Sequence, residues 1–421
     1  MDDWIQIASL AVYIVASAFL MCYGLHCYLM TWLFLRRQRA CRRRIAQRID
    51  AFLSATATEE LPFVTIQLPV YNEAEVVERV IRSAAAVDYP RDRFEVQVLD
   101  DSTDSSTALI DRVARELAGD GVNIDVVRRR ARTGFKAGAL AYGLQRARGA
   151  YAAIFDADFV VPRNFLKRTV ALMTAADDIA CVQGRWGHLN RDENVLTRAQ
   201  SVGIDGHFTA EQGARSYNGL CMNFNGTGGL WRVDAIAAAG GWSGDTLTED
   251  LDLSYRVQLN GYRIVYDYDL VCRAEIPNNA AALKGQQKRW AKGSIETAIK
   301  LVPAIFRSPR FSWVQKVEAF MHLTHYTVSV LMLLLCLCTL PVLLTVPMLS
   351  VGWLLTALWS VIVLSAMAPC VMYTTSGLVQ RHGGFSLLHF PAMLAVGTGL
   401  CVNNANAVFE AVLGRRSAFI R

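Results

Sequence analysis

Several chemical signatures are missing from this 421-residue sequence, and each absence narrows the function. No two of its ten cysteines form a CxxC pair, and about half lie in apolar runs. We therefore expect reduced thiols that pack as small hydrophobes, rather than a metal site or a disulfide framework. No GxGxxG motif follows the first expected strand, and no Walker lysine motif is present. The sequence therefore lacks the motifs that define dinucleotide-dependent dehydrogenases and P-loop proteins, which argues against both classes.

Charge is missing from the first long apolar segment. Residues 4–35 contain no Asp, Glu, Lys or Arg, and this run exceeds the roughly 20 residues that a bilayer-spanning helix needs. Seven arginines follow within residues 36–48, which places that end in the cytoplasm and the short acidic N-terminus outside. A signal peptide fits poorly, because the run is too long, the basic residues follow it and no clear cleavage site is present. We predict a first transmembrane helix.

Two further apolar runs lie in the C-terminal third. Residues 319–380 also lack charged side chains and suffice for two helices that leave the cytoplasm and return, with a turn near Pro347. The run at 382–409 contains three asparagines and precedes Arg415 and Arg416. If it spanned, those arginines would lie outside, so we predict an interfacial amphipathic helix. The net charge of +6 comes mostly from the juxtamembrane arginines, which favours a lipid bilayer with anionic lipid as partner and no nucleic acid.

The segment between these apolar runs alternates short β-rich stretches with helical patterns, which is typical of an α/β sheet. Strands are expected at 63–68, 94–99, 124–127 and 151–155. Polar residues follow the first, second and fourth of these strands. In open parallel α/β sheets, the carboxyl ends of the strands are where ligands bind.

An acidic pair, Asp156 and Asp158, comes just past the fourth expected strand. Mg²⁺ and Mn²⁺ prefer oxygen ligands and bridge such carboxylates to a nucleotide diphosphate, stabilising it as it leaves. The same pattern is common in ordinary loops. Because Asp100 and Asp101 end the second strand, the context favours a divalent cation here, without deciding between magnesium and manganese.

Two more polar motifs follow. Thr248-Glu249-Asp250 precedes a helical pattern, where acidic residues also suit a helix N-terminus and Thr246 with Glu249 could form a capping box. Gln286, Arg289 and Trp290 are spaced to share one face of a helix expected at 280–302. The tryptophan would suit a membrane-interface anchor, whereas the three side chains together suit a polymer acceptor.

In this order and at this spacing, the motifs from about Pro69 to the C-terminus resemble those of the family 2 glycosyltransferases. The likeness is to the processive, membrane-embedded synthases, and within them to the cellulose-synthase-like mannan and glucan synthases. It implies an α/β fold of the GT-A (Rossmann-like) type, with a cytoplasmic catalytic domain inserted between transmembrane and interfacial helices. The implied division is 1–48 for the first helix and basic segment, 60–280 for the catalytic domain, 281–318 for interfacial helices carrying QxxRW, 319–380 for two transmembrane helices, and 382–421 for an interfacial helix and the start of a gating-loop-like segment.

The resemblance also implies roles for individual residues. Asp250 would be the general base, beside Glu249 and Thr248. Asp158 would be the stronger metal ligand, and Asp156 would contact donor or metal. The implied nucleotide-sugar contacts are Tyr71, Glu73, Asp100, Asp101, Lys136 and Asp156, and the implied acceptor contacts are Gln286, Arg289, Trp290, Asn225, Gly226 and Thr227. Asn225 stands where cellulose synthases carry cysteine, which points to the mannan and glucan relatives.

The implied activity is inverting, processive synthesis of a β-linked hexose polysaccharide from a nucleotide sugar, with the product fed into a transmembrane channel. UDP-glucose ranks first as donor and GDP-mannose second, and the expected location is the plasma (inner) membrane. Single addition to a lipid acceptor, as in ceramide glucosyltransferase, is the alternative. A glycosidase or a transporter would explain fewer of the motifs. The family usually continues past Phe419-Ile420-Arg421 with a gating segment, so we expect a truncated product or a short channel.

Overall fold

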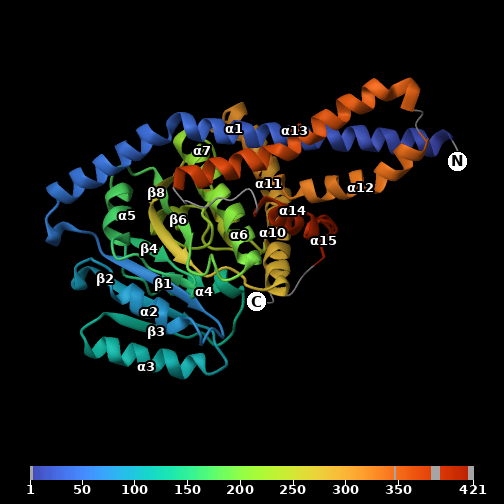
Figure 1. The fold of residues 1–421 in the computed structure, drawn as a ribbon. Coiled ribbons are helices and arrows are strands. Elements are labelled where there is room, and N and C mark those ends of the chain that lie inside the picture. Colours follow the sequence, from blue (N-terminus) through green and yellow to red (C-terminus); the bar gives the residue numbers. More distant parts are fainter. Residues whose placement is uncertain (1–2, 346–347, 381–388, 416–421) are drawn as a thin grey trace.

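The β-rich runs of the central segment form one mixed, eight-stranded sheet in the computed structural model, which describes residues 3–345, 348–380 and 389–415 (Figure 1). The strands are β1 (Val64–Val70), β2 (Phe94–Asp100), β3 (Ile124–Val127), β4 (Tyr151–Ile154), β5 (Phe159–Val160), β6 (Ile179–His188), β7 (Gly229–Arg232) and β8 (Arg263–Ala274). Their order is β3-β2-β1-β4-β7-β6-β8-β5. The first four strands pair in parallel, as expected, but β7 runs antiparallel to both β4 and β6.

Helices cover both faces of this sheet and then extend away from it. Those of the body are α2 (Val77–Ala85), α3 (Ser106–Gly119), α4 (Phe135–Leu144), α5 (Phe165–Met173), α6 (Val195–Gly206), a π-helical turn η3 (His207–Glu211), α7 (Gln212–Tyr217), α8 (Val233–Ala238) and α9 (Glu249–Leu259). The long or apolar ones are α1 (Asp3–Ala55), α10 (Ala280–Arg307), α11 (Trp313–Thr324), α12 (Thr327–Thr345), α13 (Met348–Gln380), α14 (His389–Gly399) and α15 (Cys401–Val412).

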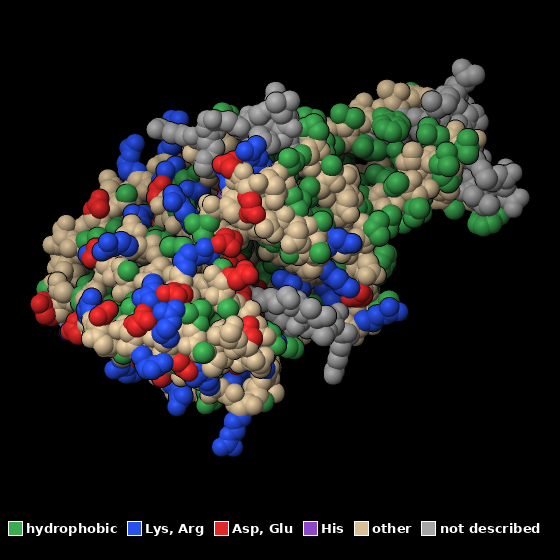
Figure 2. Space-filling model, turned by 60° about the horizontal axis from the view of Figure 1, so that its bottom comes forward, with side chains coloured by type: hydrophobic (Ala, Val, Ile, Leu, Met, Phe, Trp, Pro, Cys, Tyr) green, Lys and Arg blue, Asp and Glu red, His purple; other side chains and the backbone are tan. Residues whose placement is uncertain are grey.

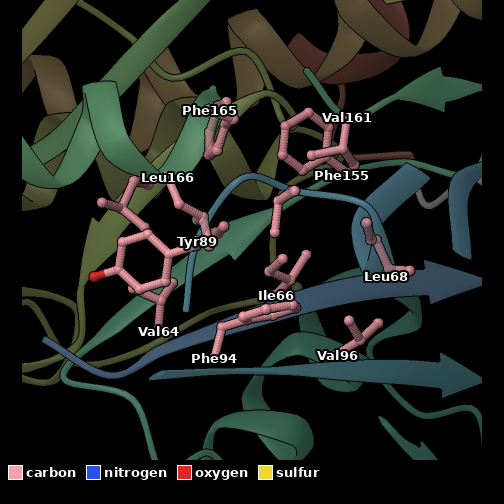
Figure 3. Close-up of a cluster of buried hydrophobic side chains, with 14 of the residues drawn as sticks. Val64, Ile66, Leu68, Tyr89, Phe94, Val96, Phe155, Val161, Phe165 and Leu166 are labelled. Carbon is pink, nitrogen blue, oxygen red and sulfur yellow. The ribbon is translucent and has the colours of Figure 1, made fainter. Parts of the chain in front are cut away.

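The core on one face of the sheet follows from the alternation in β1. Val64, Ile66 and Leu68 are fully buried and point to the same side, where they pack with Phe94 and Phe155 (Figure 3). The alternation continues through Val70, so β1 runs two residues past its expected end. Helices α2, α3 and α5 supply further side chains of this core.

The opposite face packs against α4, α7 and α9, and also against the long N-terminal helix. Met30 and Phe34 of α1 are buried in the same cluster as Trp231 of β7. The apolar run and the arginine-rich segment thus form one continuous helix of 53 residues, longer than the predicted first segment. It packs along α12 and α13, where a side chain added to Gly24 would clash with the backbone of Ser365.

Among the described residues, four helices are long and apolar enough to cross a membrane by length and composition: Ile7–Ala55, Thr327–Leu344, Trp359–Gln380 and Pro391–Val412. Figure 2 shows hydrophobic side chains gathered on a projecting arm, while Lys, Arg, Asp and Glu cover the body. The predicted hairpin begins at Thr327 rather than 319, because 319–324 belongs to α11. Residues 346–347, next to the predicted turn, lie outside the described residues.

The third apolar run forms two helices, α14 and α15, instead of one. Helix α15 lies against α10, where Lys288 Nζ and Glu410 Oε1 are 2.7 Å apart, and α14 lies against α6. The placement of this third apolar run at the membrane surface stays a prediction, since Pro391–Val412 also has the length and composition of a membrane-spanning segment. Residues 381–388 and the gating-loop-like end at 416–421 lie outside the described residues.

Candidate active site

The polar motifs meet at the carboxyl ends of the strands, as their positions in the sequence predicted. Because β1 lies between β2 and β4, the loops after these three strands are neighbours. They surround a cleft of about 240 Å³. The predicted site residues that line it are Tyr71, Glu73, Asp101, Lys136, Asp156, Asp158, Asn225, Gly226, Thr248, Glu249, Asp250, Gln286, Arg289 and Trp290. Asp100 and Thr227 lie behind its wall.

Lys136 lies at the centre of this cleft. Its Nζ is 2.6 Å from Asp156 Oδ1 and donates a hydrogen bond to the Gly226 carbonyl at 2.8 Å. Burial works against its charge, but the carboxylates of Asp156, Glu249 and Asp250 outweigh burial and raise the pKa of Lys136. The lysine therefore stays cationic in a site rich in carboxylates.

The turn at 225–228 needs glycine for two reasons. Gly226 has a φ of +81°, which side chains rarely tolerate. A Cβ at Gly226 would also lie 3.0 Å from Asp250 Oδ2 and 3.4 Å from Lys136 Nζ. The next residue, Thr227, accepts the backbone N–H of Asp156 at its hydroxyl (2.9 Å). Thr227 is thus a buried support of the acidic loop rather than a cleft-lining contact.

Asp250 lies in the first turn of α9, with Oδ1 accepting the Leu251 N–H at 2.8 Å. The helix begins after Thr248, whose side chain makes no capping hydrogen bond, so the alternative capping box from Thr246 does not form. Burial, and then the adjacent charge of Glu249, raise the pKa of Asp250 to about 7, although Lys136 opposes the shift. A carboxyl group with that pKa exchanges protons near neutral pH.

The two carboxylates after β2 have different surroundings. Asp101 lines the cleft and forms a two-pronged ion pair with Arg129, at 2.8 and 2.6 Å. Asp100 is fully buried instead: Oδ2 accepts from Arg128 at 2.8 Å and Oδ1 from the Ser102 N–H at 2.9 Å. The structure therefore does not bring Asp100 to the cleft, and its carboxylate instead stabilises the loop after β2 through these bonds.

Arg132 is a cleft residue that the sequence analysis missed. Its guanidinium carbon is 3.3 Å from the ring centroid of Tyr71, and both side chains line the cleft. A guanidinium over an aromatic face is a favourable cation–π contact. The cluster of arginines at 128–132, directly after the third strand, was the available signal.

The donor set for a cation consists of carboxylates only. No cluster of three or more His, Cys, Asp or Glu side chains that could hold a metal occurs in the described part of the chain. Asp156 and Asp158 nevertheless lie together in the cleft wall. Mg²⁺ and Mn²⁺ typically take one or two carboxylates and complete their coordination with substrate phosphates and water, so the residues present fit such an ion.

Helix α10 carries Gln286, Arg289 and Trp290 and also contacts the loop before Thr248-Glu249-Asp250. Gln286, Arg289 and Trp290 all line the cleft, which confirms that they share one face. A side chain at Gly293 would come within 2.6 Å of Thr248, so only glycine allows this approach. One turn farther on, Glu296 accepts the Leu247 N–H at 2.9 Å, and after a second turn Lys300 lies 2.7 Å from Asp252.

A second cavity, of about 460 Å³, opens from the same residues. It shares Asn225, Asp250 and Trp290 with the cleft. From there it continues past His26 of α1 and Tyr373 of α13. Asp250 therefore lies where a carboxylate-rich cleft meets a chamber lined by the long apolar helices.

A mixed sheet whose strand ends carry carboxylates, followed by an acidic helix N-terminus facing the same cleft, defines a glycosyltransferase fold of the GT-A type. The comparisons agree. The family model described as "Glycosyltransferase like family 2" matches residues 62–293, and the one described as "Cellulose synthase" matches residues 235–390. This chain belongs to the family 2 glycosyltransferases, as the motifs predicted.

The relatives point to one branch of that family. The chain is 39% identical over 264 residues to glucomannan 4-beta-mannosyltransferase 2 of Arabidopsis thaliana, covering 62% of this chain and 49% of the relative. It is 39% identical over 286 residues to glucomannan 4-beta-mannosyltransferase 1 of Oryza sativa subsp. japonica, covering 67% and 55%. The chain thus spans about half the length of these curated relatives.

A solved structure shares the fold along nearly the whole chain. It is a mannosyltransferase from Pyrobaculum calidifontis in complex with GDP-Man and Mn²⁺, with a TM-score of 0.64, 20% identity, and coverage of 96% of this chain and 99% of that one. At this level of identity, the likeness supports the fold alone.

Proposed function

We propose that this protein is a membrane-embedded, inverting, processive glycosyltransferase that builds a β-linked hexose polymer of the mannan type from a nucleotide sugar. The observation that carries the proposal is the position of Asp250 between two cavities. The carboxylate-rich cleft suits the donor, and the chamber toward the apolar helices suits the acceptor. One base then faces both substrates.

Asp250 takes the proton of the acceptor hydroxyl as that oxygen attacks the anomeric carbon. The new C–O bond forms on one face of the sugar while the bond to the diphosphate breaks on the other, so the configuration inverts. A carboxyl pKa of about 7 suits proton abstraction near neutral pH. Lys136 lies between Asp250 and Asp156, where its positive charge offsets negative charge gathering on the leaving diphosphate.

The donor diphosphate lies beside Asp156 and Asp158, which would hold Mg²⁺ or Mn²⁺ together with its oxygens. A bound cation supplies charge stabilisation for the leaving group. Tyr71, Glu73 and Asp101 line the cleft and take the nucleoside, with Arg132 stacked on the Tyr71 ring. We propose GDP-mannose as donor in place of UDP-glucose, because the relatives are named mannosyltransferases and the fold neighbour is a complex with GDP-Man.

The acceptor chain lies in the second cavity. Trp290 stacks on a sugar ring, Gln286 binds its hydroxyls, and Arg289 faces the diphosphate from the same helix face. Asn225 and Gly226 contact the terminal sugar, and the buried Thr227 supports this turn through its bond to the Asp156 N–H. Because this cavity runs between α1, α13 and α14, the growing polymer enters a path among helices that cross the plasma membrane. The arginines at 36–48 keep the catalytic domain on the cytoplasmic side.

The test is synthesis by the purified protein in nanodiscs. GDP-mannose and UDP-glucose are supplied separately, each with Mg²⁺, with Mn²⁺ and with chelator, and products are sized on a gel. The proposal expects a polymer from GDP-mannose that β-mannanase degrades, and no polymer with chelator. A single sugar on a lipid would support the alternative acceptor instead, and polymer from UDP-glucose alone would refute the donor.

A further inference from the structure

A short π-helical turn interrupts the helical run between α6 and α7. This turn, η3, spans His207–Glu211 and forms part of the wall of the second cavity. π-Helical turns are rare and occur frequently at functional sites. None of the motifs in the sequence includes His207 or Glu211, and the proposed chemistry does not use them.

A chain of hydrogen bonds runs from this turn to the acceptor loop. Glu211 Oε2 is 2.7 Å from His207 Nδ1, and His207 Nε2 is 3.1 Å from Asn225 Nδ2. An amide nitrogen only donates, so Nε2 of the imidazole accepts and Nδ1 carries the proton that is donated to Glu211. Gln212 Nε2 donates to Asn225 Oδ1, which agrees with this amide orientation.

The carboxylate that orients the imidazole is itself held in place. Arg215 donates to Glu211 Oε2 at 3.4 Å and to Glu318 Oε1 at 2.9 Å. Burial favours the neutral acid, but the bond to His207 and the charge of Arg215 outweigh it and keep the pKa of Glu211 well below its ordinary value. Glu211 is therefore a fixed hydrogen-bond acceptor.

Asn225 connects this chain of bonds to the reacting groups. Its backbone N–H donates to Gln183 Oε1 at 3.1 Å. The next residue, Gly226, accepts from Lys136 at its carbonyl and packs against the Asp250 carboxylate. Loss of the bonds to the Asn225 side chain would therefore loosen the turn whose Gly226 lies beside both Lys136 and Asp250.

We propose that His207 and Glu211 are positioning residues for sugar transfer: Glu211 fixes the imidazole, which fixes Asn225 and thereby the placement of Gly226 between Lys136 and Asp250. The inference rests on the proposed function, since it assumes that Asp250 is the base. Misplacement by about 1 Å can cost on the order of 100-fold in rate. We expect the effect on kcat, because Gly226 contacts the Asp250 carboxylate that acts as the base in the transfer step.

The test compares two substitutions at one position. His207→Gln keeps an oxygen that can accept from Asn225, whereas His207→Phe fills the space and removes the acceptor. We expect His207→Phe to lower kcat for mannosyl transfer from GDP-mannose by about tenfold or more, with KM for the donor within about twofold. His207→Gln should recover most of that loss. Equal losses in the two variants, or no loss in His207→Phe, would overturn the inference.

Glu211→Gln and Glu318→Gln form a matched pair, because each replaces one carboxylate partner of Arg215 by a neutral amide and only the first replaces the charged acceptor of His207. Glu211→Gln should lower kcat, and Glu318→Gln should not. Melting temperatures are measured beside each rate, and an equal fall of kcat in both variants would assign the effect to Arg215 and overturn the inference. Asp250→Asn in the same assay separates the inference from the proposed function. If Asp250→Asn abolishes transfer while His207→Phe leaves kcat unchanged, only this inference fails, whereas wild-type turnover in Asp250→Asn refutes the proposed function.

Discussion

Replacing Asp250 by asparagine should remove transfer and at the same time stabilise the fold above neutral pH. The pKa of this carboxyl rises from 3.8 to about 7 on folding. Because its pKa is raised in the folded state, the charged form of this carboxyl destabilises the fold. That destabilisation is absent below about pH 4 and complete above about pH 7. Three pKa units correspond to about 4 kcal/mol. Because the side chain is only half-buried, solvent screening reduces the expected gain to about 1–2 kcal/mol.

The assay is a melting curve in detergent at pH 5 and pH 8, measured beside mannosyl transfer. At pH 8, Asp250→Asn should melt about 1–2 °C above wild type, with the difference shrinking at pH 5, while transfer falls by about 100-fold or more. Asp245→Asn is the matched control. Burial raises the pKa of Asp245, but hydrogen bonds from Ser243 and Lys300 outweigh it and lower the pKa, so that variant should lose stability at pH 8. A lower melting temperature for Asp250→Asn at pH 8 would refute the burial argument.

Three further substitutions test the other parts of the site. Asp158→Ala should abolish cation-dependent donor binding, measured by calorimetry with GDP-mannose, and chelation of wild type should have the same effect; full activity in excess chelator would contradict it. Trp290→Ala should shorten the polymer more than it slows the first transfer, because a lost aromatic platform costs on the order of 1 kcal/mol per contact; unchanged product length with a lower melting temperature would make Trp290 a structural anchor. Gly293→Ala should lower kcat with little change in donor KM, because its Cβ would push Thr248 aside; wild-type kinetics would show that the contact relaxes freely.

The motifs could be placed from the sequence because their positions depend on local patterns. Apolar alternation fixes where β1, β2 and β4 end, so the polar residues after them had to share one edge. The same logic failed for Asp100, since the direction of its carboxylate depends on Arg128, which follows β3 and is 28 residues away. His207 and Glu211 left no signal either, because a π-helical turn has no residue spacing that distinguishes it from the α-helices on both sides.

The strand directions outside the first four also depended on long-range packing. β7 pairs antiparallel with β4 although 74 residues lie between Ile154, the last residue of β4, and Gly229, the first residue of β7. The sequence between them contains strands β5 and β6 and helices α5, α6 and α7, so periodicity alone could not predict this pairing. The break at Leu400 between α14 and α15 was missed for a similar reason, since that run contains no proline after Pro391 to mark it.

Helix α10 and residues 245–250 are packed and bonded together. Gly293 contacts Thr248 closely, and Glu296 and Lys300 bind the loop around it, so the two segments move as one rigid body. Exchanging only residues 286–290 for those of a relative would therefore not transfer that relative's acceptor preference. The position of Asp250 also depends on the contact between α10 and Thr248. The exchangeable module is the pair of segments together. Residues 245–250 and helix α10 lie about 30 residues apart in the chain, and we expect substitutions in one to require matching substitutions in the other. A redesign should therefore exchange both segments together.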